Sequence, residues 1–214
     1  MLDLSTEKKY FDLGYNLIAG LDEAGRGPLA GPVVAACVII DRDFKIDHPD
    51  LELVTDSKKL RPKQREKLFA VIKDKVRAVE IGVVDNLIID RINILQASFS
   101  AMRKALKKIQ LTPDYILLDG PFKIPGIATP QTAIIKGDAS VFCVAAASII
   151  AKVSRDYLMS ELAKEYPAYE FEKHKGYGTK LHLDKIAQHG PCPIHRFSFA
   201  PLKDIGAKKA KPKT

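Results

Sequence analysis

Long apolar runs and a secretory leader are both missing from this sequence of 214 residues. Its longest largely apolar run, residues 141–151, is well short of the roughly 20 residues that a helix needs to cross a bilayer. The first residues show no basic stretch followed by an apolar one, which is the pattern of a secretory signal. We therefore expect a cytoplasmic protein that has no membrane partner.

Cysteine is scarce, and its spacing gives no indication of a zinc site. The three cysteines, Cys37, Cys143 and Cys192, lie far apart, are odd in number and form no Cys-x-x-Cys pair. Cys37 and Cys143 sit within apolar runs, as core residues do. None of the five histidines has a convincing metal-ligand spacing either. A zinc enzyme with sulfur or imidazole ligands is therefore not indicated.

Negative charge is in the minority, and the positive excess favours an anionic partner such as nucleic acid or a membrane surface. The net charge is +8 and the pI is about 9.3. Residues 203–214 contain five lysines and one aspartate, a net +4 that is half of the total. This segment, rich in Ala, Gly, Lys and Pro, is expected to be a disordered tail. The remaining domain, residues 1–202, is only mildly basic, so charge alone does not decide the function.

The spacing of apolar residues predicts an α/β domain. Strands are expected where short β-branched or unbroken apolar runs occur, over residues 15–22, 33–40, 78–84, 115–120 and 132–136. Helices are expected where apolar residues recur every three or four positions, over residues 62–76, 92–109, 141–164 and 179–189. This order predicts a mixed sheet, with the first three strands antiparallel and the others parallel. Helices would flank the sheet on both faces, and a helical C-terminal lobe would follow it.

Acidic side chains stand where three of these strands end. Asp22 and Glu23 end the first strand, Asp119 ends the fourth, and Asp138 follows the fifth. Ligands of open α/β sheets gather at the carboxyl ends of the strands, so neighbouring strands would bring four carboxylates together. Such like charges repel unless a cation neutralises them, and Mg²⁺ or Mn²⁺ suits oxygen ligands without sulfur or imidazole. The pattern therefore predicts a metal site.

Each of these acids also has a structural interpretation that the residues alone leave open. Asp22 and Glu23 could form a solvated turn, and Asp119 with Gly120 could be a common turn pair. Asp138 could cap the helix that follows it. The coincidence of acids at three strand ends is what favours the metal site.

Beyond these patterns, residues 22–36 resemble the signature of type 2 ribonuclease H, also called ribonuclease HII. Further segments resemble other blocks of that family in the same order: residues 56–60, 118–120, 136–138, 145–156 and 176–179. Residues 195–201 resemble the bacterial branch, and the likeness extends over about residues 15–202. The resemblance implies a ribonuclease H-like fold, with residues 1–202 forming the catalytic domain.

The same resemblance implies an endonuclease that hydrolyses the RNA strand of RNA–DNA hybrids. It also implies cutting at single ribonucleotides in duplex DNA, use of two Mg²⁺ or Mn²⁺ ions, and products with 3′-hydroxyl and 5′-phosphate ends. The partners would be RNA–DNA hybrids and ribonucleotide-containing duplex DNA, and a monomer is expected.

Two sets of residues match functional positions of that family. The metal-binding and catalytic carboxylates are Asp22, Glu23, Asp119 and Asp138. The substrate-binding residues that match are Gly25, Arg26, Gly27 and Tyr177, and to these we add Lys58 and Arg155 as expected substrate-binding residues outside the match. We expect Asp22 to bridge the two ions, and the glycines to admit the sugar whose 2′-hydroxyl separates RNA from DNA. Tyr177 matches the tyrosine that packs against the adjoining sugar, while Lys58 and Arg155 are expected to contact phosphates.

Simpler interpretations remain open for the substrate-binding set: a tight turn for the glycines, a buried loop aromatic for Tyr177 and solvated surface for the basic residues.

Two other functions also remain open. A DNA-specific nuclease such as a junction resolvase would have the same acids but no 2′-hydroxyl reader. A non-catalytic nucleic-acid-binding module would have no need for four acids, which repel phosphate unless a metal is bound.

Overall fold

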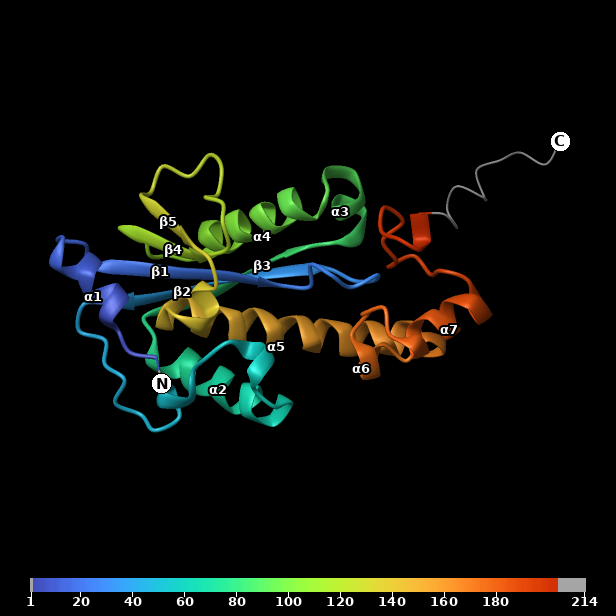
Figure 1. Ribbon diagram of the computed structural model, residues 1–214, viewed down its shortest axis with the longest axis horizontal. Helices are drawn as coiled ribbons and strands as arrows, with labels where there is room; N and C mark the ends of the chain where they lie inside the picture. Colours follow the sequence, from blue (N-terminus) through green and yellow to red (C-terminus); the bar gives the residue numbers. More distant parts are fainter. Residues whose placement is uncertain (1, 204–214) are drawn as a thin grey trace.

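A mixed five-stranded sheet is the frame of the computed structural model, which describes residues 2–203 (Figure 1). The strands are β1 (Leu17–Ala24), β2 (Val33–Asp41), β3 (Ala78–Val84), β4 (Tyr115–Asp119) and β5 (Gln131–Ile134). Their order across the sheet is β3-β2-β1-β4-β5. The pairs β1–β2 and β2–β3 are antiparallel, and the pairs β1–β4 and β4–β5 are parallel. The predicted mixed sheet is therefore confirmed.

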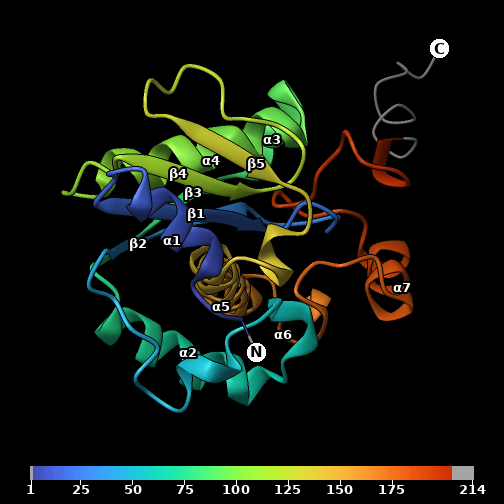
Figure 2. The same ribbon diagram turned by 60° about the vertical axis from the view of Figure 1, so that its left-hand side comes forward.

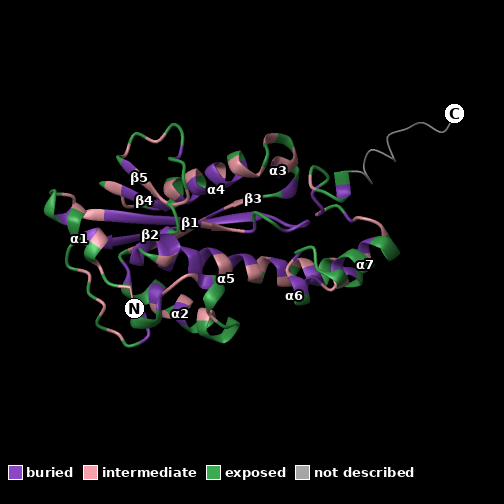
Figure 3. Cartoon of the chain, viewed as in Figure 1, coloured by how far each residue is buried: buried purple, intermediate pink, exposed green. Residues whose placement is uncertain are grey.

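Helices cover both faces of this sheet (Figures 1 and 2). One face packs against α5 (Phe142–Glu165), which is covered in turn by α2 (Pro62–Lys75), and the other face packs against α3 (Asn86–Ile92) and α4 (Ile94–Lys108). Both β1 and β2 are buried along most of their length (Figure 3), which explains their nearly unbroken apolar sequence. Beyond α5, the short helix α6 (Phe171–His174) and α7 (Lys180–His189) form the predicted C-terminal lobe.

The first helix, α1 (Ser5–Asp12), has no counterpart among the elements that the sequence predicts. It is short and polar, and contacts distant in sequence stabilise it. Phe11 is buried, and the buried carboxylate of Glu7 accepts a hydrogen bond from the backbone N–H of Cys143 at 2.9 Å. Because that donor is 136 positions away, no local pattern reveals the helix.

The helix predicted over residues 92–109 differs from the structure at its start. There α3 ends at Ile92 and α4 begins at Ile94, because Asn93 has a φ of 67° in the left-handed region. The Asn93 side chain accepts a hydrogen bond from the backbone N–H of Gln96 at 3.1 Å. Asn93 is thus both the break between two helices and the N-cap of the second.

The register of the parallel strands brings three strand ends to one edge of the sheet. Leu21 of β1 pairs with Leu118 of β4, so the next residues, Asp22 and Asp119, lie side by side. In turn β4 pairs with β5, which leads into a short 3₁₀-helix that carries Asp138. The carboxyl ends of β1, β4 and β5 therefore meet, as expected for ligand sites in such sheets.

No helix within residues 2–203 is long and apolar enough to span a membrane. The predicted basic tail, residues 203–214, lies outside the described residues except for Lys203.

Candidate active site

Three of the predicted carboxylates meet at this edge of the sheet. Asp22, Asp119 and Asp138 each place one oxygen within 4.8 Å of the others. Asp22 and Asp138 are buried, and Asp119 is partly exposed. The backbone N–H of Gly137 donates to Oδ1 of Asp119 at 2.8 Å. This bond fixes the turn that carries Asp138 against the end of β4.

Glu23 lies outside this group of three, although it lines the same hollow as Asp22 and Asp119. Successive residues of a strand point to opposite faces of the sheet. Glu23 accordingly also borders Leu95 of α4, which Asp22 does not, and both residues line the hollow beside Ser148 of α5. Oε1 of Glu23 accepts a hydrogen bond from Nη1 of Arg26 at 3.0 Å. Glu23 therefore lies at the border of the site and forms an ion pair with the guanidinium of Arg26.

The electrostatics of the three acids favour a bound cation. Burial raises the pKa of Asp22 well above its ordinary value, and the charges of Glu23 and Asp119 raise it further. Burial also raises the pKa of Asp138, although the ammonium of Lys58, 3.3 Å from Oδ2 of Asp138, opposes that shift. A donor set made only of oxygens, with excess negative charge, fits a hard divalent cation rather than zinc.

A hollow of about 310 Å³ lies over the acids. Its lining includes residues 22–27, Lys58, Asp119, Lys152 and Tyr177. The structure therefore gathers most of the residues that the sequence predicts for metal and substrate binding.

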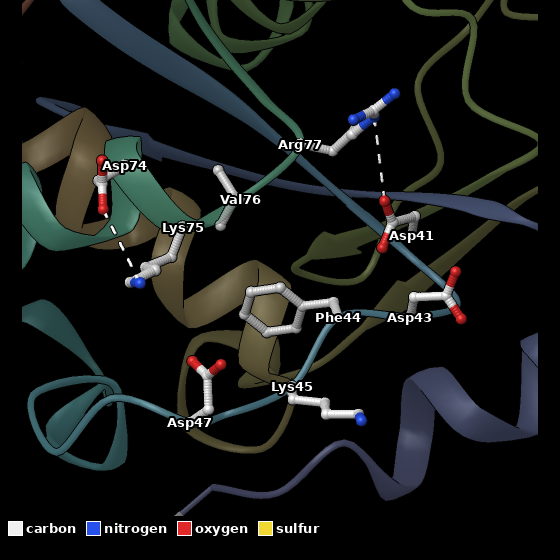
Figure 4. Close-up of a pocket in the computed structure, with 9 residues that line it drawn as sticks. All are labelled: Asp41, Asp43, Phe44, Lys45, Asp47, Asp74, Lys75, Val76 and Arg77. Atoms are coloured by element: carbon white, nitrogen blue, oxygen red, sulfur yellow. Dashed lines mark ion pairs between the residues drawn. The ribbon is translucent and has the colours of Figure 1, made fainter.

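A second hollow, of about 440 Å³, lies at the opposite end of the sheet, where β2 ends and β3 begins (Figure 4). Charges of both signs line it, and the close-up shows Arg77 paired with Asp41 and Lys75 paired with Asp74. Within the described part of the chain, its acids form no group that could hold a metal ion. This hollow therefore lacks the features of an active site.

The two glycines of the loop after β1 differ in their surroundings. Gly25 has a φ of +98°, and a Cβ there would lie 2.1 Å from Nε of Arg155. The fold itself therefore requires glycine at this position. A Cβ on Gly27 would meet nothing within 4 Å. Since no internal contact demands glycine at position 27, the open space beside it is available to a ligand.

The phosphate contact expected for Arg155 does not fit the structure, because the Arg155 side chain is fully buried. The guanidinium donates to the backbone oxygens of Pro32 at 2.9 Å, Lys175 at 3.0 Å and Ala30 at 3.2 Å. Burial lowers the pKa of Arg155 to about 10, which leaves it charged at neutral pH. Its role is to tie α5 to two loops of the site.

Tyr177 stands at the rim of the hollow with 40% of its surface exposed, so it is not a buried loop aromatic. The cationic groups of Lys152 and Arg155 each lie 5.7 Å from the centre of its ring. Its backbone oxygen accepts a hydrogen bond from Nδ1 of the buried His182 at 2.9 Å. Burial lowers the pKa of His182 to about 4, so a neutral imidazole holds the Tyr177 loop at neutral pH.

Sequence reasoning missed two polar residues of α5 that border the acids, Ser148 and Lys152. They are four positions apart and so share one face of the helix. Oγ of Ser148 lies 2.8 Å from Oγ of Ser57, next to Lys58. The hydroxyl of Ser148 also lies near Asp22 and opposes the rise that burial causes in the pKa of Asp22. The available signal was two polar residues, one helical turn apart, in an otherwise apolar stretch.

Comparison with known proteins gives one consistent result. The family model described as Ribonuclease HII matches residues 19–202. A protein named Ribonuclease HII from Endomicrobium trichonymphae is 52% identical over 201 residues, which covers 94% of this chain and 93% of the relative. Another of that name, from Caldicellulosiruptor saccharolyticus, is 50% identical over 211 residues, 95% of this chain and 99% of its own. The solved structure of ribonuclease H2 from Pyrococcus horikoshii OT3 is 30% identical, with a TM-score of 0.71 over 92% of this chain and 100% of that one.

Proposed function

The chain belongs to the ribonuclease HII family, and we propose that its strand-end carboxylates carry out the reaction of that family. The family comprises divalent-metal-dependent endoribonucleases that act on RNA–DNA hybrids, and the fold is ribonuclease H-like. The reaction is hydrolysis of the RNA strand, including at single ribonucleotides in duplex DNA, and leaves 3′-hydroxyl and 5′-phosphate ends. The convergence of Asp22, Asp119 and Asp138 within 4.8 Å carries this proposal.

The acids named above would hold Mg²⁺ or Mn²⁺, with Glu23 at the border of the site. When bound, two such ions activate the attacking water and stabilise the leaving 3′ oxygen. Asp22 would be a central ligand of these ions, because it is buried and the charges of Glu23 and Asp119 both act on it.

Other residues around the hollow bind and orient the substrate. Lys58 and Lys152 supply positive charge beside the acids and are suited to contact phosphates. The space beside Gly27 admits a ribose, and the exposed ring of Tyr177 packs against the adjoining sugar. Orientation of this kind accelerates the reaction because the scissile phosphate is held over the acids in one geometry.

The test compares three substrates of one sequence: an RNA–DNA hybrid, a DNA duplex with one ribonucleotide, and an all-DNA duplex. Each is incubated with Mg²⁺, with Mn²⁺ and with EDTA. We expect cleavage of the first two with either ion, none in EDTA, and 5′-phosphate on the products. Equal cutting of the all-DNA duplex would establish a DNA-specific nuclease instead. Binding without cleavage in every condition would establish a non-catalytic module.

Divalent ions are expected to stabilise the folded protein, because only the folded chain gathers the three acids. At a free ion concentration one hundredfold above the dissociation constant, mass action contributes about 2.7 kcal/mol. For a chain of this size that is a rise of roughly 5–10 °C in Tm. Calorimetry with Mn²⁺ and with EDTA measures the rise, which should be smaller in Asp119→Asn. A Tm that does not respond to millimolar Mn²⁺ contradicts a preformed site.

Nucleic acid is the partner that this function requires. We propose that the protein acts on it as a monomer. The cytoplasmic location stays a prediction of the sequence.

A further inference from the structure

A fully buried arginine near the C-terminal end of the described chain, Arg196, lies beneath the loop of residues 25–31, which we call the glycine loop. Its Nε donates to the backbone oxygen of Gly31 at 3.0 Å, and Nη1 donates to that of Arg26 at 3.1 Å. Its Nη2 donates to the oxygens of Gly25 at 2.7 Å and Gly31 at 2.8 Å. Each nitrogen of the guanidinium thus donates at least one hydrogen bond to a backbone carbonyl.

Arg196 forms no ion pair with any carboxylate of the described residues, which is unusual for a buried charge. Burial lowers its pKa to about 9, so the group is still protonated at neutral pH. A buried charge is costly unless its N–H groups are hydrogen bonded, and here the carbonyls of one loop supply the acceptors. The buried guanidinium is therefore stabilised by the loop's carbonyls and in turn fixes the conformation of that loop.

The direction of these carbonyls fixes the direction of the amides that follow them. In a trans peptide the C=O of one residue and the N–H of the next point in opposite directions. The oxygens of Gly25 and Arg26 both turn towards Arg196, so the N–H groups of Arg26 and Gly27 both turn away from it. Neither N–H has a hydrogen-bond partner within the described residues. Two consecutive donors are therefore presented together.

The residues that carry these two donors, Arg26 and Gly27, both line the hollow over the acids. Successive N–H groups that point the same way form a small concavity that binds oxygen acceptors. The empty space at the Cβ position of Gly27 leaves that concavity accessible. The guanidinium of Arg196 thus holds the glycine loop on its buried side, and the other side of the loop is open beside the carboxylates of the site.

We propose that Arg196 is a positioning residue for substrate selection, which orients the Arg26 and Gly27 amides to donate to the ribose 2′-oxygen at the cleavage point. The inference rests on the proposed function, because it assigns a selecting role within that site. Arg196 never touches the substrate, since the glycine loop covers it. It acts by keeping two peptide planes in one orientation, so that no reorganisation is needed when the ribose arrives.

The test measures binding of Arg196→Lys to two matched duplexes, one with a single ribonucleotide and one all-DNA, in Ca²⁺ with gels to verify that no product forms. A lysine keeps the charge but lacks the planar fork, so it cannot hold the same set of carbonyls. We expect affinity for the all-DNA duplex to stay within about twofold, while the preference for the ribonucleotide falls at least about tenfold, the scale of leaving one buried polar group without its hydrogen bond.

Leu68→Ala is the matched control, because Leu68 is a buried residue of α2 and α2 does not line the hollow over the acids. It should lower the Tm and leave the ribonucleotide preference unchanged, which separates lost stability from lost positioning. A folded Arg196→Lys protein with the full preference overturns the inference alone. A wild-type protein without any preference overturns the proposed selection of ribose, and the inference with it.

A second pair of variants tests the amides even if Arg196→Lys does not fold. Arg26→Ala removes a side chain, whereas Arg26→Pro removes the same side chain and also the backbone N–H. We expect Arg26→Pro to lose at least about tenfold more of the ribonucleotide preference than Arg26→Ala. Equal preference in the two folded variants would show that the amide is not used, which also overturns the role of Arg196.

Discussion

Asp22→Asn is expected to abolish cleavage while the protein stays folded. Asp22 is the innermost of the three acids, and an amide cannot replace its charge at a shared metal ligand. Loss of a residue that acts as part of a catalytic unit costs about 10⁴-fold or more in turnover. Single-turnover cleavage of an RNA–DNA hybrid in Mg²⁺ measures the effect. Turnover near that of the wild type in folded Asp22→Asn contradicts the proposed site.

The stability of the same variant separates catalysis from folding. Burial raises the pKa of Asp22 in the folded chain, so ionisation of this carboxyl favours the unfolded chain. Its contribution to stability is therefore present at low pH and is lost as the pH rises through the raised pKa. Without divalent ions, Asp22→Asn should have a Tm at pH 7 equal to or above that of the wild type. Asp47→Asn, which changes an exposed carboxylate at the far hollow, should alter neither Tm nor turnover.

Wild-type protein is expected to cut a duplex with one ribonucleotide about 10⁴-fold faster than its 2′-deoxy counterpart. A site built to bond a hydroxyl leaves polar groups unpaired when that hydroxyl is missing, and discrimination of about this size results. The two unpartnered amides of the glycine loop are the groups concerned. Initial rates on the two duplexes, in the same Mg²⁺ concentration, give the ratio. Comparable rates would end the ribonuclease interpretation.

Two glycine variants show where this selectivity resides. Gly27→Val should fold with an unchanged Tm, because no atom of the chain lies within 4 Å of the new Cβ. It should nevertheless lose at least about 10²-fold in cleavage of the ribonucleotide duplex, as a small misplacement of the sugar does. Gly25→Ala should instead lose stability, by about 1–3 kcal/mol, because of the positive φ and the collision with Arg155. An equal loss of stability in both variants would contradict the different surroundings that the structure shows.

The acids were the most predictable part of the site, because their position depends on local signals. Asp22 and Asp119 each end a run of apolar residues, and such runs can be assigned to strands without knowledge of the rest of the chain. The position of Glu23 was also within reach of the sequence. Alternation along β1 turns its side chain away from that of Asp22, so Glu23 lines the hollow without joining the group of three acids.

Contacts between distant segments account for what the sequence could not predict. Arg155 is buried among distant segments, and its Nε donates a hydrogen bond to the backbone oxygen of Pro32, 123 positions earlier. The same is true of α1, whose buried Glu7 depends on the start of α5. A lone basic or acidic residue carries no local mark of such a partner, so exposure is the natural expectation and burial is learned only from the fold.

The bonds between Arg196 and the glycine loop span 171 positions of the chain, from one end of the domain to the other. Contacts of such long sequence separation form late in folding, because closing a long loop costs entropy that few contacts have yet offset. During synthesis the N-terminal part emerges first, so a nascent chain can display all of the carboxylates before residue 196 exists. The acids are therefore synthesised well before the residue that holds the glycine loop.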